Sequence, residues 1–191
     1  MISEIKEKIL SNTWKPLKLF TYQYKTSKGE IWHQKREVYD KGDGAAVLMY
    51  NKIAKTILMT KQFRMPAYVN GVADGIMTEV PAGMLDKDDP ETCIIKEIEE
   101  ETGYKINKVT KVLDCFMTPG AVTEITHMFV AEYQETMKVS NGGGVSTEQE
   151  DIILFEMSFK EAKQNIENNK IKDAKTLILL QYAWLHQLLE D

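Results

Sequence analysis

The sequence predicts an α/β layered domain, preceded by a small N-terminal lobe of antiparallel strands. Strand-like alternation recurs along the chain in pairs of segments joined by short polar turns. Helical segments are few, and they are interspersed with the strands in mixed order. The length of 191 residues suits one domain with an added lobe. We therefore expect the lobe at residues 1–42 and the main domain at residues 43–191.

Apolar spacing and turn residues predict the individual elements. Residues 3–10 are expected to form a short helix, because Ile5, Ile9 and Leu10 then share one side. Residues 66–75 and 140–147 are expected to be loops, and the three glycines of the second suggest mobility. Strands are expected at 17–24, 31–39, 45–50, 56–63, 78–80, 109–117, 125–134 and 152–157.

The best-marked helix covers residues 90–102. Asp89 is suited to cap it, Pro90 fits its first position, and Gly103 fits its C-terminal stop. Ser158 and Glu161 form a capping-box pattern that predicts a second helix ending near residue 168. A last helix is expected at about 174–189.

Composition narrows the class of protein. Hydrophobic residues make up 43% and charged residues 28%, as in ordinary globular chains. No apolar run reaches the length of a membrane span, and the N-terminal residues lack the apolar core of a signal peptide. The two cysteines are too few for a disulfide framework. We therefore expect a cytoplasmic protein that binds no membrane, and the lack of a basic patch predicts no nucleic-acid partner.

Acidic residues are concentrated in residues 83–104. Eight acids and two lysines leave this segment at −6, whereas the whole chain carries −5. At helical spacing Glu97, Glu100 and Glu101 share one narrow stripe beside the buried isoleucines. Like charges at this spacing cost about 0.2–0.5 kcal/mol per pair, and a hard divalent cation would reverse the repulsion. A solvated helix face is the alternative interpretation.

The segment from Gly83 to Tyr104 resembles the Nudix box, with Glu97-Ile98-Glu99-Glu100-Glu101-Thr102-Gly103 as its most specific part. Asp89 stands where the family has a loop glutamate, Lys96 stands for its arginine, and the spacer between them is one residue short. In the family these two positions form an ion pair, and Asp89 with Lys96 can still do so. The resemblance implies a Nudix fold, a mixed β-sheet between helices.

The resemblance also implies Mg²⁺-dependent hydrolysis of a nucleoside diphosphate linked to another group, with Mn²⁺ as the alternative metal. The implied metal ligands are the Ala82 carbonyl, Glu97, Glu101 and Glu150. The implied catalytic residues are Glu100, Glu101 and Glu150. Glu150 follows the glycine-rich loop, which would close over the substrate as a lid. A plain surface hairpin is the alternative for this loop.

Further segments resemble the nucleoside-diphosphate-sugar pyrophosphatases of the Nudix family. They include Lys35-Arg36-Glu37, Gln62-Phe63-Arg64 and Glu79-x-Pro-Ala-Gly83, while Pro119 resembles a marker of the ADP-ribose branch. The implied substrate is therefore a nucleoside diphosphate sugar, with ADP-ribose or a broad range of such sugars as the alternative. A non-catalytic regulator is the third hypothesis. It is disfavoured because the box glutamates are present and no basic helix-turn-helix is visible.

The same resemblance implies the substrate contacts. The substrate-binding residues carried over are Trp14, Lys35, Arg36, Glu37, Arg64, Ala82, Gly83, Met84, Glu101, Glu124, Gln149, Glu150 and Lys175. For Lys35 and Arg36, the alternative interpretation is that they are ordinary surface charges. For Trp14, the alternative is that its side chain belongs to the core. The related enzymes imply a homodimer with exchanged N-terminal lobes, in which Trp14 reaches the partner's site.

Overall fold

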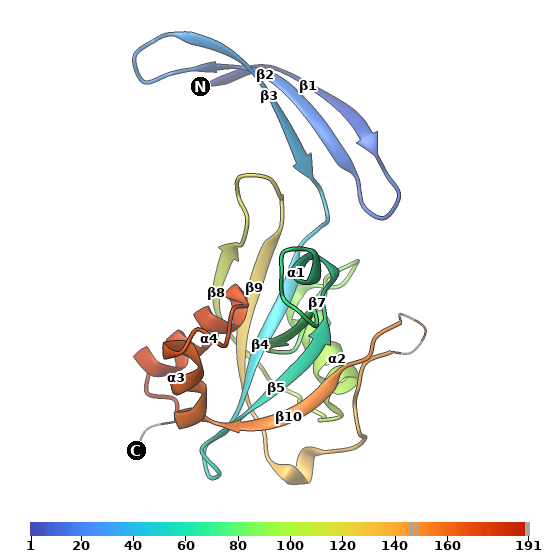
Figure 1. The fold of residues 1–191 in the computed structure, drawn as a ribbon, viewed down its shortest axis with the longest axis vertical. Helices are drawn as coiled ribbons and strands as arrows, with labels where there is room; N and C mark the ends of the chain where they lie inside the picture. Colours follow the sequence, from blue (N-terminus) through green and yellow to red (C-terminus); the bar gives the residue numbers. More distant parts are fainter. Residues whose placement is uncertain (146, 148, 190–191) are drawn as a thin grey trace. The chain divides into compact units, whose positions relative to one another are not determined.

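The computed structural model describes residues 1–145, 147 and 149–189. The chain forms two compact units (Figure 1). The N-terminal unit comprises Met1–Asp43 together with Phe116–Ile125, and the large unit comprises Gly44–Cys115 and Thr126–Asp191. The expected domain boundary after residue 42 stays a prediction. The contacts also assign a second segment, Phe116–Ile125, to the N-terminal unit.

The N-terminal unit is built on an antiparallel sheet in the order β1-β2-β3. The expected helix at residues 3–10 is wrong, because this segment is a strand. A bulge between Ser3 and Lys6 inserts one extra residue opposite β2. Ile2 and Ile9 therefore face the same side although they are seven residues apart, a spacing that imitates a helix. The strands are β1 Ile2–Ser11, β2 Leu17–Lys25 and β3 Ile31–Tyr39.

The second segment of this unit pairs with the end of β3. The Tyr39 N–H donates to the Ala121 carbonyl at 2.8 Å, and the Thr123 N–H donates to the Tyr39 carbonyl at 3.1 Å. The Thr123 hydroxyl also donates to Asp40 at 3.0 Å. The segment Phe116–Ile125 is thus part of the N-terminal unit.

The large unit contains a mixed sheet in the order β10-β5-β4-β9-β8, with β6 added to β5 and β7 to β4. β4 and β9 are parallel, while the pairs β10–β5, β5–β4, β5–β6 and β4–β7 are antiparallel. Seven strands make up the sheet: β4 Gly44–Asn51, β5 Thr56–Phe63, β6 Ile76–Glu79, β7 Ala82–Met84, β8 Thr110–Phe116, β9 Ile125–Glu132 and β10 Ile153–Ser158. Only the three-residue β7 was not expected, because so short a segment carries no alternation.

Helices cover this sheet, and the expected α/β class is confirmed. Helix α2 packs on the face of β4 that carries Ala45, Val47 and Met49. Helix α4 also contacts β4 (Figure 1). The helices and helical turns are α1 Met65–Val69, α2 Pro90–Glu97 continued by the π-helical turn Ile98–Thr102, the 3-10 turn Glu135–Met137, α3 Phe159–Glu167 and α4 Ala174–Leu185. The expected loop at 66–75 is wrong at its start, where Pro66 opens the short α1. Within the described residues, none of these helices has the length and apolarity to span a membrane.

Candidate functional site

Helix α2 begins as its sequence predicts. The Asp89 carboxylate accepts the N–H groups of Glu91 and Thr92 at 3.1 Å each, which satisfies two donors of the first turn. The expected Asp89–Lys96 ion pair is replaced by one between Asp88 and Lys96. Because Asp89 is engaged by the helix start, the lysine pairs with the preceding acid. Asp88 also restores the seven-residue spacer that Asp89 lacks.

At the end of this helix, the three glutamates that were expected on one stripe differ in burial. The last turn widens into a π-helical turn and stops at Gly103, whose φ is 74°. Glu101 is 3% exposed, Glu97 is half-buried, and Glu100 is exposed. Only Glu97 and Glu101 therefore face the protein, while Glu100 faces solvent.

β7 lies directly against these two carboxylates. The Ala82 N–H donates to Glu101 Oε2 at 3.2 Å. A Cβ on Gly83 would stand 1.9 Å from Glu97 Oε1, so only glycine leaves room for that carboxylate. The neighbouring Met84 carbonyl accepts the Cys93 thiol at 3.3 Å. Ala82, Gly83, Glu97 and Glu101 are thus brought together as expected.

Burial, together with the nearby negative charges of Glu97 and Glu150, raises the pKa of Glu101 to about 8. The Ala82 N–H and the positive charge of Arg64 act in the opposite direction. Glu97 and Glu150 are therefore close enough to Glu101 for their charges to disfavour its ionised form. Such a set of oxygen donors fits a hard divalent cation. Within the described residues, no three His, Cys, Asp or Glu side chains lie close enough together to hold a metal ion as the structure stands.

The glycine-rich segment docks on the end of the box helix. The N–H groups of Gly143 and Gly144 donate to the carbonyls of Glu101 and Glu100 at 2.8 and 3.1 Å. A Cβ on Gly142, where φ is 63°, would stand 2.4 Å from the Glu101 carbonyl oxygen. The segment contains no helix or strand between 140 and 145, as expected, and the glycines permit this close backbone approach.

This docking carries Glu150 toward the helix. Its Oε2 accepts the Val145 N–H at 3.0 Å, and its charge acts on Glu101. Gln149 precedes it with a left-handed φ of 58°. Ser146 and Glu148 lie outside the described residues.

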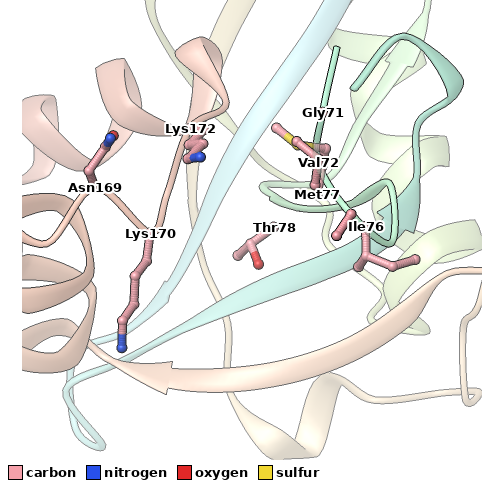
Figure 2. Close-up of a pocket in the computed structure, with 9 residues that line it drawn as sticks. Gly71, Val72, Ile76, Met77, Thr78, Asn169, Lys170 and Lys172 are labelled. Atoms are coloured by element: carbon pink, nitrogen blue, oxygen red, sulfur yellow. The ribbon is translucent and has the colours of Figure 1, made fainter. Parts of the chain in front are cut away.

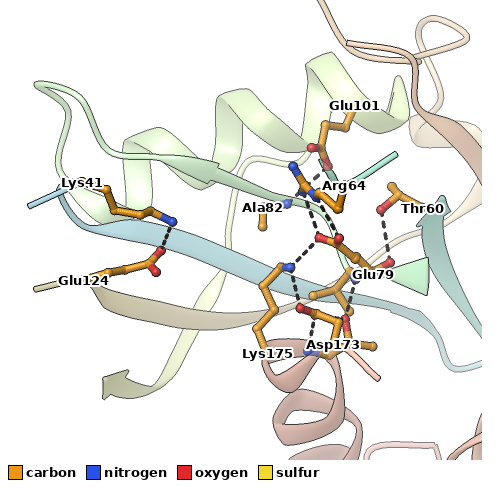
Figure 3. A network of polar contacts seen from close by, with 11 residues as sticks. Lys41, Thr60, Arg64, Glu79, Ala82, Glu101, Glu124, Asp173 and Lys175 are labelled. Atoms are coloured by element: carbon orange, nitrogen blue, oxygen red, sulfur yellow. Dashed lines mark hydrogen bonds and ion pairs between the residues drawn. The ribbon is translucent and has the colours of Figure 1, made fainter. Parts of the chain in front are cut away.

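A second cluster stands beside Glu101 (Figure 3). Glu79 accepts both the Nε–H and an Nη2–H of Arg64 at 2.9 Å each. It also accepts from Lys175 Nζ at 2.5 Å, and this ammonium donates to Asp173 at 3.0 Å. The two cations hold the pKa of Glu79 down at about 2, although its burial acts in the opposite direction.

Glu79 belongs to the Glu79-x-Pro-Ala-Gly83 segment, but no role at the site was expected for it. It ends β6, and its side chain is 5% exposed. The sequence feature that could have identified it is an acidic residue at a buried position of a short strand, because a buried carboxylate requires a cationic partner. Arg64 and Lys175, both expected to contact substrate, are the partners that it takes.

The remaining expected residues belong to the N-terminal unit. Trp14 is 65% exposed and its ring lies 6.2 Å from that of Tyr39, so the alternative of a core residue is wrong for the single chain. Lys35, Arg36 and Glu37 are exposed on β3, where alternation turns Arg36 to the face opposite the other two. Glu124 is not solitary, because it pairs with Lys41 at 2.7 Å.

A separate cavity of about 420 Å³ in the large unit contains none of the expected residues (Figure 2). It lies between β6 and the loop that joins α3 to α4. Its lining residues are Gly71, Val72, Ala73, Ile76, Met77, Thr78, Asn169, Lys170 and Lys172.

Known proteins match both parts of the chain. The NUDIX domain model matches residues 40–179, and the model described as "GDP-mannose pyrophosphatase NudK N-terminal domain" matches residues 2–39. The chain is 46% identical to a GDP-mannose pyrophosphatase of Cronobacter sakazakii over 97% of this chain and 96% of the relative. It is 44% identical to one of Salmonella typhimurium, over 99% and 98% respectively.

A solved structure supports the fold. The match to the crystal structure of an ADP compounds hydrolase covers 98% of this chain and 95% of the hydrolase chain, with a TM-score of 0.70 and 14% identity. At that identity the likeness concerns the fold alone, and it confirms the expected mixed sheet between helices. Together with the family model across residues 40–179, the match over the full length establishes that the chain belongs to the Nudix hydrolase family.

Proposed function

We propose that this protein hydrolyses the pyrophosphate bond of GDP-mannose and releases GMP and mannose 1-phosphate. The observation that carries the proposal is the buried Glu101, held by the Ala82 N–H beside Glu97. The similarity to GDP-mannose pyrophosphatases extends over both units and supports the choice of substrate.

We assign Mg²⁺ as the cation, with Mn²⁺ as the alternative. Glu97, Glu101, Glu150 and the Ala82 carbonyl are the residues that would hold it. When bound, such a cation neutralises charge on a diphosphate and lowers the pKa of a bound water. The action of the Glu97 and Glu150 charges on Glu101 supports this assignment, since a bound cation would attract all three carboxylates.

The chain's own residues bind and orient the substrate. Arg64 keeps 41% of its side-chain surface exposed and presents a planar cation suited to phosphate oxygens. Glu150 accepts the proton of the attacking water at its carboxylate, because the glycines before it let the segment approach the helix. Glu100 is the competing base, although it faces solvent. Gly83, Met84 and Gln149 contribute backbone contacts around the reacting phosphates.

The N-terminal unit supplies the remaining contacts in a homodimer with exchanged lobes. Lys35, Arg36, Glu37 and Glu124 act near the diphosphate and the sugar, and Trp14 stacks on the guanine of the partner's site. Exposed apolar side chains on this sheet support association, because a free surface of this kind usually marks an interface. The exposed members are Ile2, Ile5, Ile9, Leu10, Trp14, Tyr24, Ile31 and Trp32.

The proposal includes a cytoplasmic enzyme without nucleic-acid or membrane partners. A net charge of −5 without a basic patch supports the exclusion of nucleic acid.

A panel of nucleoside diphosphate sugars tests the function. Purified protein with Mg²⁺ is expected to convert GDP-mannose to GMP and mannose 1-phosphate with the highest kcat/KM in the panel. Product analysis by ³¹P NMR distinguishes cleavage of the pyrophosphate from release of GDP. A higher kcat/KM for ADP-ribose would assign the alternative substrate instead. Binding of every sugar without turnover would instead support a regulator.

A further inference from the structure

Glu79 is a buried acid at the end of a short edge strand, and such a group needs full compensation. Its side chain is 5% exposed, yet the flanking cations keep its pKa at about 2, so it is ionised at any working pH. A buried carboxylate without partners would cost several kcal/mol. The chain therefore keeps this charge only because it engages two cations at once.

The contacts of Glu79 join three distant elements. Arg64 follows β5, Glu79 ends β6, and Lys175 lies in the first turn of α4. The bidentate pair with Arg64 uses Nε and Nη2, which fixes both the position and the plane of the guanidinium. Arg64 is thus oriented, while the rest of its surface stays exposed.

Lys175 is anchored from behind. Its ammonium lies between Glu79 and Asp173 and its side chain is 16% exposed. Asp173 in turn caps α4 by accepting the N–H of Thr176 at 3.0 Å. The Thr176 hydroxyl accepts the Val80 N–H at 2.8 Å, so the residue after Glu79 is tied to the same helix turn.

We propose that Glu79 is a positioning residue, which holds Arg64 in the orientation needed for the diphosphate and uses Lys175 as a buried counter-charge rather than a substrate ligand. This inference rests on the proposed function, because it takes Arg64 as the group that binds phosphate. It assigns Lys175 a different role from the substrate contact expected from family resemblance. The diphosphate would meet a guanidinium whose direction is set before binding.

Glu79→Gln tests the proposal, with Glu132→Gln as its matched control. Both variants remove one carboxylate charge from the same sheet, but Glu132 pairs only with an exposed Lys52 at 3.4 Å. Loss of the oriented guanidinium weakens ground-state and transition-state binding alike. We expect KM for GDP-mannose to rise about 10- to 100-fold in Glu79→Gln, with kcat within about threefold of the parent. The control is expected to match the parent.

A purely structural role for Glu79 would give a different result. The melting temperature would fall, but the folded fraction of Glu79→Gln would keep the parental KM, and that outcome would overturn the proposal. Glu79→Asp gives a second variant, which keeps the charge but shortens the side chain and should raise KM less than Glu79→Gln. If Lys175→Met raises KM as much as Arg64→Lys does, Lys175 is a substrate ligand and its assignment here is wrong.

An experiment without turnover separates this inference from the proposed function. The Nε–H signal of Arg64 is assigned in ¹⁵N NMR spectra by comparison with Arg64→Lys. It should be visible in the parent and in Glu132→Gln and be lost in Glu79→Gln. Inorganic pyrophosphate should shift this signal in the parent. A parent that shows the shift but does not hydrolyse GDP-mannose would refute the proposed substrate and leave Glu79 in its role. No difference in the signal among the three proteins would refute the positioning role, whatever the substrate.

Discussion

β1 and β4 are strands of similar length in the two units, and they differ in what stabilises them. Every residue of β1 is exposed except Ser11, so its pairing with β2 uses mainly backbone hydrogen bonds. In β4 every residue but the last is buried, because the sheet continues on both sides and helices pack against it. The large unit thus contains its own core, whereas the N-terminal sheet leaves apolar surface that a partner would cover.

The same contrast appears in the ion pairs. In the N-terminal unit Lys18 lies 2.9 Å from Asp40, and both side chains are partly exposed. The lysine and the Thr123 hydroxyl lower the pKa of Asp40 only through exposed contacts. In the large unit the Glu79 carboxylate is enclosed, and Lys175 holds it together with Arg64. Exposed pairs are weak because solvent screens them, while enclosed pairs set the geometry of neighbouring groups.

The largest expected effect is on the buried glutamate of the large unit. Glu101→Gln should lower kcat at least about 100-fold, because a cation ligand is removed while the side chain keeps its shape and an acceptor for the Ala82 N–H. The fold should persist, with an unchanged circular dichroism spectrum. Near-normal turnover in this variant would exclude the Nudix mechanism for this chain.

Complementation tests whether the N-terminal unit serves a partner. Glu101→Gln and Trp14→Ala are each expected to be inactive as homodimers. When the two proteins are mixed and allowed to exchange, one site of each mixed dimer receives both intact groups, so about a quarter of the parental activity should return. A fully active monomer in sedimentation, or exchange without recovery, would refute the exchanged dimer.

A smaller effect is expected at the glycine-rich segment. Glu150→Gln should reduce kcat about tenfold or more while KM changes little, because Glu150 is proposed to act on the attacking water rather than on binding. Steady-state kinetics with GDP-mannose measures both constants. Glu100→Gln is the comparison, and a stronger loss there would assign the proton acceptor to the exposed glutamate instead.

The smallest effect concerns stability in acid. The pKa of Glu79 is about 2 in the folded chain, below its ordinary value of 4.5, so its ion pairs stabilise the fold above pH 4.5. That contribution, on the order of 3 kcal/mol, should be lost as pH falls from about 4.5 toward 2. Urea unfolding between pH 2 and 6 should show a shallower pH dependence for Glu79→Gln. Asp40→Asn, in the exposed pair, should change the profile less.

The fold of the large unit was largely predictable because each strand and helix is marked by nearby residues. The apolar run of β4 indicates a strand that is buried on both faces. Asp89 and Ser158 cap the helices that their positions predicted. The box glutamates Glu97 and Glu101 were recognisable from the resemblance of residues 83–104 to the Nudix box.

What failed depends on contacts between distant segments. The bulge in β1 exists only against β2, and alone its spacing resembles a helix. The pairing of Lys96 with Asp88 rather than Asp89 follows from which acid the helix start engages. The division between buried Glu101 and exposed Glu100 follows from the π-helical turn and from the docking of Gly143 and Gly144.

The sequence by itself determined the element types of the large unit and the glutamates of the Nudix box, because these depend on neighbours within one or two turns. Only the tertiary structure decided that Glu79 engages Arg64 and Lys175, since the three residues lie on β6, after β5 and on α4. A buried charge selects its partners by distance and solvent exclusion, and neither is encoded in local periodicity.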